Sequence, residues 1–306
     1  MNMRKKLLII TTSFFMATFS FAQDTTDISK MLEDELKAND INKTYYTTAT
    51  FKTTRLIDGH SVENIAPGVL DVKISHRFGT IGGSNGGAYN FFGLDNATMR
   101  LGFDYGITHT LMIGIGRSTS NKTFDAFFKL KILRQSTGKR KMPITLSYVP
   151  TIGVISFRDT SLYKFFSSRV NFTHQLIIGR KFTEGLSLQI MPTLVHRNYP
   201  VDRGPNDVYA FGIGGRQKLS KRTSFNAEYY YQIPSTKVPG TVNVLSLGFD
   251  IETGGHVFQL HITNSSSMTE SNFITGNKGS WQKGDILFGF NISRVFNVVK
   301  KHTKEW

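Results

Sequence analysis

Large apolar side chains alternate with polar or small ones along the stretch from residue 97 to residue 134. Apolar residues occupy every second position from Met99 to Tyr105, and charged residues or glycines lie between them. The same alternation returns from Leu111 to Ile115 and from Phe124 to Ile132. A period of two is the signature of a β-strand with two unlike faces. The stretch therefore predicts three antiparallel strands joined by short connections.

The alternation continues along the chain and predicts twelve strands counted from Gly68. Their connections alternate between long and short, with one brief exception at 119–123 on the long side. Outer-membrane barrels have short periplasmic turns and long outer loops, whereas a soluble sandwich has no such bias. The pattern therefore favours an all-β, antiparallel transmembrane β-barrel of about 12 strands. The predicted long loops are 79–96, 158–168, 197–206, 234–241 and 265–283, and the short turns lie near His109, Gly185, Lys221 and Gly254.

The first 22 residues resemble a secretory signal peptide. Three basic residues, 4–6, precede an apolar run from Leu7 to Phe21, and cleavage is expected after Ala22. The apolar run is shorter than the roughly 20 residues that a spanning helix needs. We then expect residues 23–67 to be a short N-terminal periplasmic extension or plug segment, 68–298 the barrel and 299–306 a C-terminal tail.

The region 23–67 lacks the regular alternation of the barrel. The apolar spacing between Asp24 and Lys43 predicts a short helix. The segment from Tyr45 to Ile57 is rich in Thr and its apolar face is narrow, so two interpretations stay open. It is either an additional strand or a segment that plugs the barrel mouth.

Charge and cysteine content narrow the choice of partners. Residues 1–22 contain three of the 37 Lys and Arg and none of the 22 Asp and Glu, so the remainder carries 34 basic and 22 acidic residues, a net charge of +12. In an exported protein this excess favours outer-membrane lipid and small anionic solutes over nucleic acid. The chain has no Cys, so neither disulfides nor thiolate metal sites stabilise it.

The polar face of the predicted strands carries charges of both signs. Two interpretations of this face remain open: a weakly anion-preferring pore, or a barrel interior filled by compensating ion pairs. On the strand from Leu245 to Ile251, Leu247 and Phe249 are expected to meet lipid, and Ser246 to face the lumen. The residues that we predict to face the lumen are Lys73, Arg77, Arg100, Asp104, Asp125, Lys129, Lys131, Arg169, Arg216, Glu228, Asp250 and Asp285.

No catalytic, metal or cofactor site is predicted. His174 lies on the apolar face without a Ser beside it on its strand, and His196, Asp202 and Asp207 occur in or beside a loop, where such residues are common. The other histidines lack the spacing of metal ligands. The pairs of glycines around Ile115 and Ile213 lie in mid-strand without a following helix, so a nucleotide loop is excluded, and they are interpreted as sites where the strands bend.

Several segments resemble a family of outer-membrane barrels of Gram-negative bacteria that is known chiefly as a domain of unknown function. The likeness rests on Thr50 to Glu63 (TFKTTRLIDGHSVE), His76 to Gly79, Leu101 to Ser118 (LGFDYGITHTLMIGIGRS), Glu252 to Ser265 and Gly289 to Phe296. The resemblance implies a barrel in the outer membrane and supplies no catalytic residue.

The sequence thus predicts an outer-membrane barrel that acts as a passive channel or small-solute transporter and is not an enzyme. The alternative is a structural or docking protein that binds partners through its loops and its N-terminal segment. Neither the solute nor a protein partner is identified by the sequence.

Overall fold

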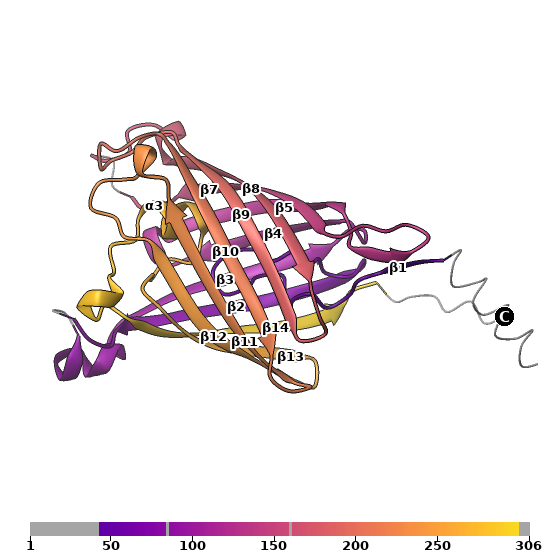
Figure 1. The fold of residues 1–306 in the computed structure, drawn as a ribbon. Helices are drawn as coiled ribbons and strands as arrows, with labels where there is room; N and C mark the ends of the chain where they lie inside the picture. The colour runs from indigo at the N-terminus through magenta and orange to yellow at the C-terminus, as the bar shows by residue number, and fades with distance from the viewer. Residues whose placement is uncertain (1–42, 84–85, 159–160, 300–306) are drawn as a thin grey trace, which may run out of the picture. The chain divides into compact units, whose positions relative to one another are not determined.

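Twelve strands pair in sequence order and close on themselves in the computed structural model, which describes residues 43–83, 86–158 and 161–299. The last strand pairs with the first, and every neighbouring pair is antiparallel (Figure 1). The predicted twelve-stranded barrel is therefore confirmed. The barrel strands are β2 (Val69–Thr80), β3 (Ala97–Gly106), β4 (Leu111–Ser118), β5 (Thr123–Leu133), β7 (Thr145–Ile155), β8 (Val170–Lys181), β9 (Leu186–Arg197), β10 (Asp207–Lys218), β11 (Thr223–Gln232), β12 (Val244–Thr253), β13 (His256–Thr263) and β14 (Leu287–Asn297).

The chain divides into two units, one comprising residues 1–46 and 136–141 and the other the rest. In the described part of the first unit, β1 (Thr44–Tyr46) and β6 (Ser136–Gly138) form a two-stranded antiparallel sheet. The predicted signal peptide and the predicted helix between Asp24 and Lys43 lie outside the described residues, as do residues 300–306 of the predicted tail. The barrel belongs entirely to the second unit.

The two ends of the barrel differ in their connections. At one end, here called the long-loop end, most connections are long and contain the short 3-10 helices Gly87–Gly93, Ser167–Arg169, Pro234–Thr236 and Trp281–Lys283. The exception is the connection through the 3-10 helix Ser120–Lys122. At the other end, the short-turn end, residues 254 and 255 alone join β12 to β13. None of the described helices is long and apolar enough to cross a membrane.

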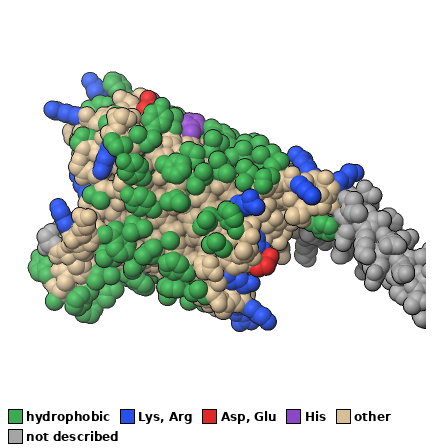
Figure 2. Space-filling view, in the orientation of Figure 1, with side chains coloured by type: hydrophobic (Ala, Val, Ile, Leu, Met, Phe, Trp, Pro, Cys, Tyr) green, Lys and Arg blue, Asp and Glu red, His purple; other side chains and the backbone are tan. Residues whose placement is uncertain are grey.

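The strand period sorts the side chains between the outer surface and the lumen. In β3 the side chains of Leu101 and Phe103 are 40% and 39% exposed, whereas those of Arg100 and Asp104 are buried. Apolar side chains cover much of the outer surface between the two ends of the barrel, and Lys and Arg lie mainly towards the ends (Figure 2). An apolar band between two polar rims is the outer surface expected of a barrel embedded in lipid.

Candidate functional site

The lumen contains a segment that precedes the first barrel strand. Residues 50–65, here called the plug segment, enter from the short-turn end, where β2 begins, and Phe51, Leu56 and His60 are at most 3% exposed. The Leu56 amide donates to the Gly59 carbonyl (2.8 Å) and the Ser61 amide to the Thr54 carbonyl (3.0 Å). These bonds fold residues 54–61 into a tight turn inside the barrel. The extra strand considered above is limited to the three residues of β1.

The tip of the plug segment is bound by a carboxylate of the barrel wall. Glu228 on β11 accepts the amides of Ile57 (3.1 Å) and Gly59 (3.0 Å). A Cβ atom at Gly59 would lie 2.0 Å from the Tyr230 hydroxyl oxygen, so only glycine fits here. Two amides that have no partner within the plug segment are thereby satisfied, as a buried backbone requires.

A lysine on β5 binds the two arms of the plug segment together. Lys129 is fully buried, and its Nζ donates to the carbonyl oxygens of Thr54 (2.8 Å), Ser61 (2.9 Å) and Glu63 (3.0 Å). No carboxylate lies within ion-pair distance of Lys129 in the described part of the chain. Its direct hydrogen-bond partners are thus three backbone carbonyls.

Ion pairs and amides supply further contacts between the wall and the plug segment. Asp58 pairs with Arg77 on β2 (2.8 Å) and accepts a hydrogen bond from the Ser246 hydroxyl on β12 (2.5 Å). Lys73 pairs with Asp104 (2.5 Å), and both contact the Thr54 hydroxyl. Plug carbonyls are also bound by the side chains of Gln189, Arg216, Gln259 and Asn291.

The loop predicted to lie outside, 265–283, folds back into the barrel instead. It contains α3 (Glu270–Thr275), and all six residues of this helix are buried. Asn272 donates to the Thr123 hydroxyl on β5 (3.0 Å), and Phe273 packs edge-on against Tyr230 at 5.0 Å between ring centroids. Phe273 and Ile274 lose contact with water by this arrangement, and their burial explains why the loop does not extend into solvent.

The plug segment and α3 meet inside the lumen. Arg55 Nη1 lies 2.6 Å from Glu270 Oε1, and both side chains are at most 8% exposed. Arg55 Nη2 lies 3.4 Å from His60 Nε2. Burial lowers the pKa of His60 well below its usual range, and Arg55 lowers that pKa further. His60 is therefore neutral, and its 3.5 Å contact with Glu270 is not an ion pair.

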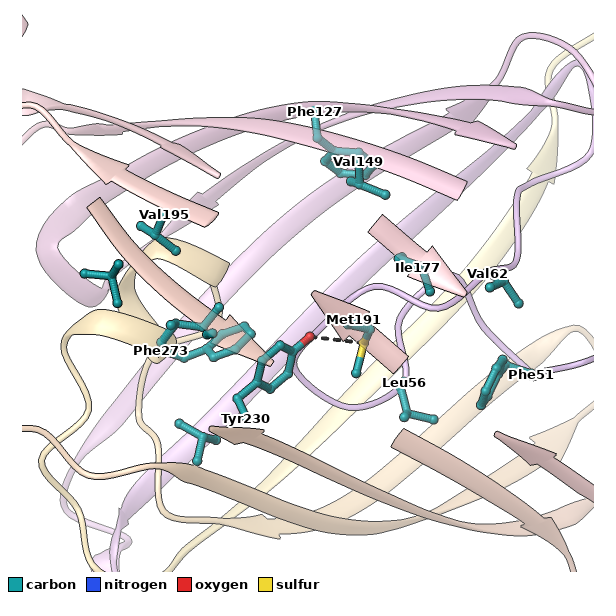
Figure 3. Packing of buried hydrophobic residues seen from close by; sticks show 14 of the residues in the cluster. Phe51, Leu56, Val62, Phe127, Val149, Ile177, Met191, Val195, Tyr230 and Phe273 are labelled. Carbon is teal, nitrogen blue, oxygen red and sulfur yellow. Dashed lines mark hydrogen bonds between the residues drawn. The ribbon is translucent and has the colours of Figure 1, made fainter. Parts of the chain in front are cut away.

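An apolar cluster fills part of the lumen (Figure 3). Leu56 and Val62 of the plug segment and Phe273 of α3 belong to one buried cluster with wall residues of β4, β5 and β7–β12. The Tyr230 hydroxyl donates to the Met191 sulfur at 3.3 Å within it. The wall residues of this cluster are Met112, Phe127, Val149, Ile177, Met191, Val195, Val208, Ala210, Tyr230 and Val244.

Another part of the lumen contains a cavity with charged side chains in its lining. A space of about 340 Å³ lies at the short-turn end between the plug segment and the β2, β12, β13 and β14 walls, with Lys52, Glu63 and Glu252 among its lining residues. A second space of about 20 Å³ continues it inward and reaches Arg55 and Lys73. That volume holds about one water molecule. Beyond it, wall side chains such as Arg77 and Ser246 are at most 1% exposed, so the middle of the barrel is closed.

The twelve residues predicted to face the lumen fall into three groups. Arg100 and Asp125 pair with each other across β3 and β5 (2.5 Å), and no hydrogen bond joins either to the plug segment. Lys131, Arg169 and Asp285 are only half-buried. The other seven are buried: Lys73, Arg77, Asp104, Lys129, Arg216, Glu228 and Asp250. All of these except Asp250 contact the plug segment.

Two of the glycines predicted to bend the strands leave space for side chains in the lumen. A Cβ at Gly116 would lie 2.3 Å from the Arg100 guanidinium, and one at Gly214 would lie 2.2 Å from Leu56 of the plug segment. These positions provide space in the lumen for an arginine and for the plug segment. The interpretation as bending sites did not include this role, because the sequence does not show which side chains approach these glycines across the lumen.

A plug within residues 23–67 was among the predictions, but neither its contacts inside the lumen nor the apolar cluster of the wall was predicted. A signal for the latter was present, because runs such as Leu176 to Ile178 and Ile190 to Met191 are apolar on both faces of a strand. Strands buried on both faces lose the alternation. For Arg55, Asp58 and Glu270 no local pattern indicated burial.

The residues considered for catalysis form simple pairs near the outer surface. Tyr148 Oη lies 2.7 Å from His174 Nδ1, and His196 Nδ1 lies 2.6 Å from Asp207 Oδ1. Asp202 pairs with Arg197 (2.6 Å) and is not joined to His196. Within the described ranges, no three His, Asp or Glu side chains are grouped as a metal ion would need.

Comparison with solved structures returns outer-membrane barrels. The NanC porin has a TM-score of 0.47 at 9% identity and aligns over 74% of this chain and 98% of its own. The KdgM porin in complex with disordered oligogalacturonate has a TM-score of 0.44 at 9% identity, over 74% and 99%. LpxR from Salmonella typhimurium has a TM-score of 0.34 at 10% identity, over 74% and 99%. Likenesses this weak do not identify a solute.

A family model gives a firmer assignment. The family described as "Membrane bound beta barrel domain (DUF5777)" matches residues 51–296, a range that includes most of the plug segment and nearly all of the barrel. No curated protein matches the chain. The outward apolar band, the closed twelve-stranded sheet and this match agree on an outer-membrane location. The chain belongs to the DUF5777 family of membrane-bound β-barrel domains.

Proposed function

We propose that the protein is a gated channel or transporter for small polar solutes, closed at rest by the plug segment. The observation that carries this proposal is the way the plug segment is held. Its backbone is bound by side chains of wall strands spread around the barrel, including Lys129 on β5, Glu228 on β11 and Gln259 on β13. A buried polar network is a poor way to fill a permanently sealed barrel, since apolar side chains of similar volume are often as stabilising or more so. The same groups are well solvated once the plug segment withdraws.

The route we propose starts at the cavity of the short-turn end and passes through the space that the plug segment leaves on withdrawal. The cavity of about 340 Å³ opens at the short-turn end and narrows between the plug segment and Lys73. With the long loops on the outside, this end faces the periplasm, so a periplasmic event would release the plug segment. Leu56 and Val62 would leave with the plug segment, while Phe273 of α3 and the wall residues of the apolar cluster would stay in place as the fixed side of the gate.

We further propose that the solutes include small anions, with a weak preference over cations. Withdrawal of the plug segment would leave Lys129 and Arg216 facing the lumen, and in the described chain neither is paired with a carboxylate. The preference is weak because withdrawal also frees Glu228. Like-charged groups along a pore select permeants of the opposite sign.

Planar-bilayer recording with an ion-selectivity readout tests this function. The full-length mature protein should be closed most of the time, and a variant with residues 50–65 replaced by a flexible linker should conduct steadily. Heat-modifiable migration in detergent gels controls for folding, because a closed barrel resists unfolding. A folded linker variant that passes no ions would refute the proposal and favour the structural role. Arg55→Gln with Asp58→Asn provides a second test if the linker variant does not fold.

A further inference from the structure

A hollow on the outer surface of the barrel lies beside an unpaired arginine. It has a volume of about 410 Å³ and is lined mainly by apolar side chains of β3, β4, β5 and β7. A second hollow of about 350 Å³ shares Ala126 and Ile152 with it. Ile115 and Ile152 flank Ala126 in the sheet register, and the small methyl group between them leaves the depression.

Arg117 lies at the long-loop side of the hollow. It is exposed on the outward face of β4, next to the strand end at Ser118, and its guanidinium lies 4.9 Å from the centroid of the Phe124 ring. Across the described chain, no carboxylate forms an ion pair with Arg117. At about 3.3 Å per residue, Arg117 is roughly 7 Å along the strand from Ile115. The charge is therefore located at the rim of the apolar band and the hollow within it.

A second cation lies at the same rim. Lys122 is in the connection between β4 and β5, and its ammonium lies 5.9 Å from the centroid of the Phe157 ring. The Lys122 carbonyl accepts the Ser156 amide (3.2 Å), which joins this connection to the end of β7. An unpaired cation at the edge of a lipid-facing surface is stabilised by the phosphates of lipid head groups.

We propose that this surface is a binding site for a phosphate-bearing membrane lipid. The phosphate contacts Arg117 and Lys122, and one acyl chain lies in the hollow over Ala126. The hollow alone would accept any apolar group, but the two cations without carboxylate partners make an anionic amphiphile the complementary occupant. A second copy of the chain would bring another Arg117 or an apolar strand to this rim and would leave the charge without a partner.

Native mass spectrometry of the detergent-solubilised protein tests the site with three probes of matched chemistry. These are phosphatidylglycerol, a diacylglycerol with the same chains, and glycerol 3-phosphate. Phosphatidylglycerol should be retained more strongly than the other two, because only it supplies both charge and chain. Arg117→Gln should weaken this retention roughly fivefold to tenfold. Arg180→Gln is the matched control, since Arg180 also faces outward over a phenylalanine, Phe182, at the short-turn end (5.1 Å).

A second pair of variants tests the hollow independently of the charge. Ala126→Trp fills the depression and should weaken retention of phosphatidylglycerol, whereas Ala227→Trp on β11 should not. Both changes are apolar and face outward, so folding should be preserved, as heat-modifiable migration will show. Equal retention by Arg117→Gln and Arg180→Gln overturns the proposal. So does a dimeric mass that Ala126→Trp abolishes, because a second copy would then be the occupant.

Discussion

Replacing Lys129 by methionine should loosen the plug segment without damaging the barrel. Methionine has about the length of lysine but cannot donate a hydrogen bond. In the structure Lys129 Nζ binds three carbonyls, and the Ser61 and Glu63 carbonyls have no other hydrogen bond to a described backbone or side-chain group. The variant therefore leaves two buried acceptors unsatisfied when the plug segment is in place, and only then.

The magnitude follows from the energies of these bonds. Each unsatisfied buried acceptor costs about 1 to 3 kcal/mol, while removal of the buried ammonium recovers part of its desolvation penalty. The net loss for the plugged state should be about 1.5 to 3 kcal/mol. A difference of 1.4 kcal/mol is tenfold in an equilibrium constant. The withdrawn population should therefore rise roughly 10-fold to 100-fold.

Hydrogen–deuterium exchange measures this population directly. The amides of Ile57 and Gly59 are bound by Glu228 and exchange only when the plug segment withdraws. Their exchange should accelerate roughly 10-fold to 100-fold in Lys129→Met, while the strand amides stay protected. Lys131→Met is the matched control, because Lys131 is half-buried on the same side of β5 and makes no hydrogen bond to the plug segment. Unchanged exchange in Lys129→Met would refute the view that Lys129 holds the gate.

Four further outcomes follow from the same contacts. Gly59→Ala should raise conductance, because the added Cβ atom would lie 2.0 Å from the Tyr230 hydroxyl oxygen. Tyr230→Phe in the same chain removes that oxygen and should partly restore closure. Conductance that stays low in Gly59→Ala would contradict this. In the folded protein, Asn272→Cys should not react with a maleimide, whereas Lys283→Cys at an exposed position should react. Equal labelling of the two variants would place α3 outside the lumen. Phe249→Arg on the lipid face should lower the unfolding free energy by about 2 to 4 kcal/mol near the bilayer midplane. Ser246→Arg on the luminal face should instead displace Asp58 and open the barrel. If Phe249→Arg is tolerated, the lipid and lumen faces have been exchanged. Protonation of His60 should favour withdrawal, because below the ordinary His pKa of about 6.5 a solvated His60 takes up a proton that the buried ring does not. The withdrawn state then binds more protons, and the contribution of His60 to the stability of the plugged state falls as pH falls. The ratio of wild-type conductance to His60→Gln conductance should therefore rise by at most about tenfold per pH unit below about 6.5, and a ratio that does not change with pH would contradict this.

The strand pattern by itself determined the barrel. Period-two alternation depends only on which neighbours a side chain has along its own strand, so the apolar face of β3 and the turn after Asp250 could be placed without tertiary information. Twelve strands with unequal connections then left a closed sheet as the consistent arrangement. The same period predicts that Arg100 and Asp125 face the lumen, but it does not predict that they pair with each other.

The contents of the lumen were decided only by the tertiary structure. The plug segment and α3 are short, lack a strong period and lie more than 200 residues apart in the chain, as the Arg55–Glu270 pair shows. Their burial results from many hydrogen bonds to wall strands that are distant in sequence, and no local pattern records such partners. The exposed face of a strand is a property of its own residues, whereas the closure of this barrel depends on which distant segment satisfies the groups that line it.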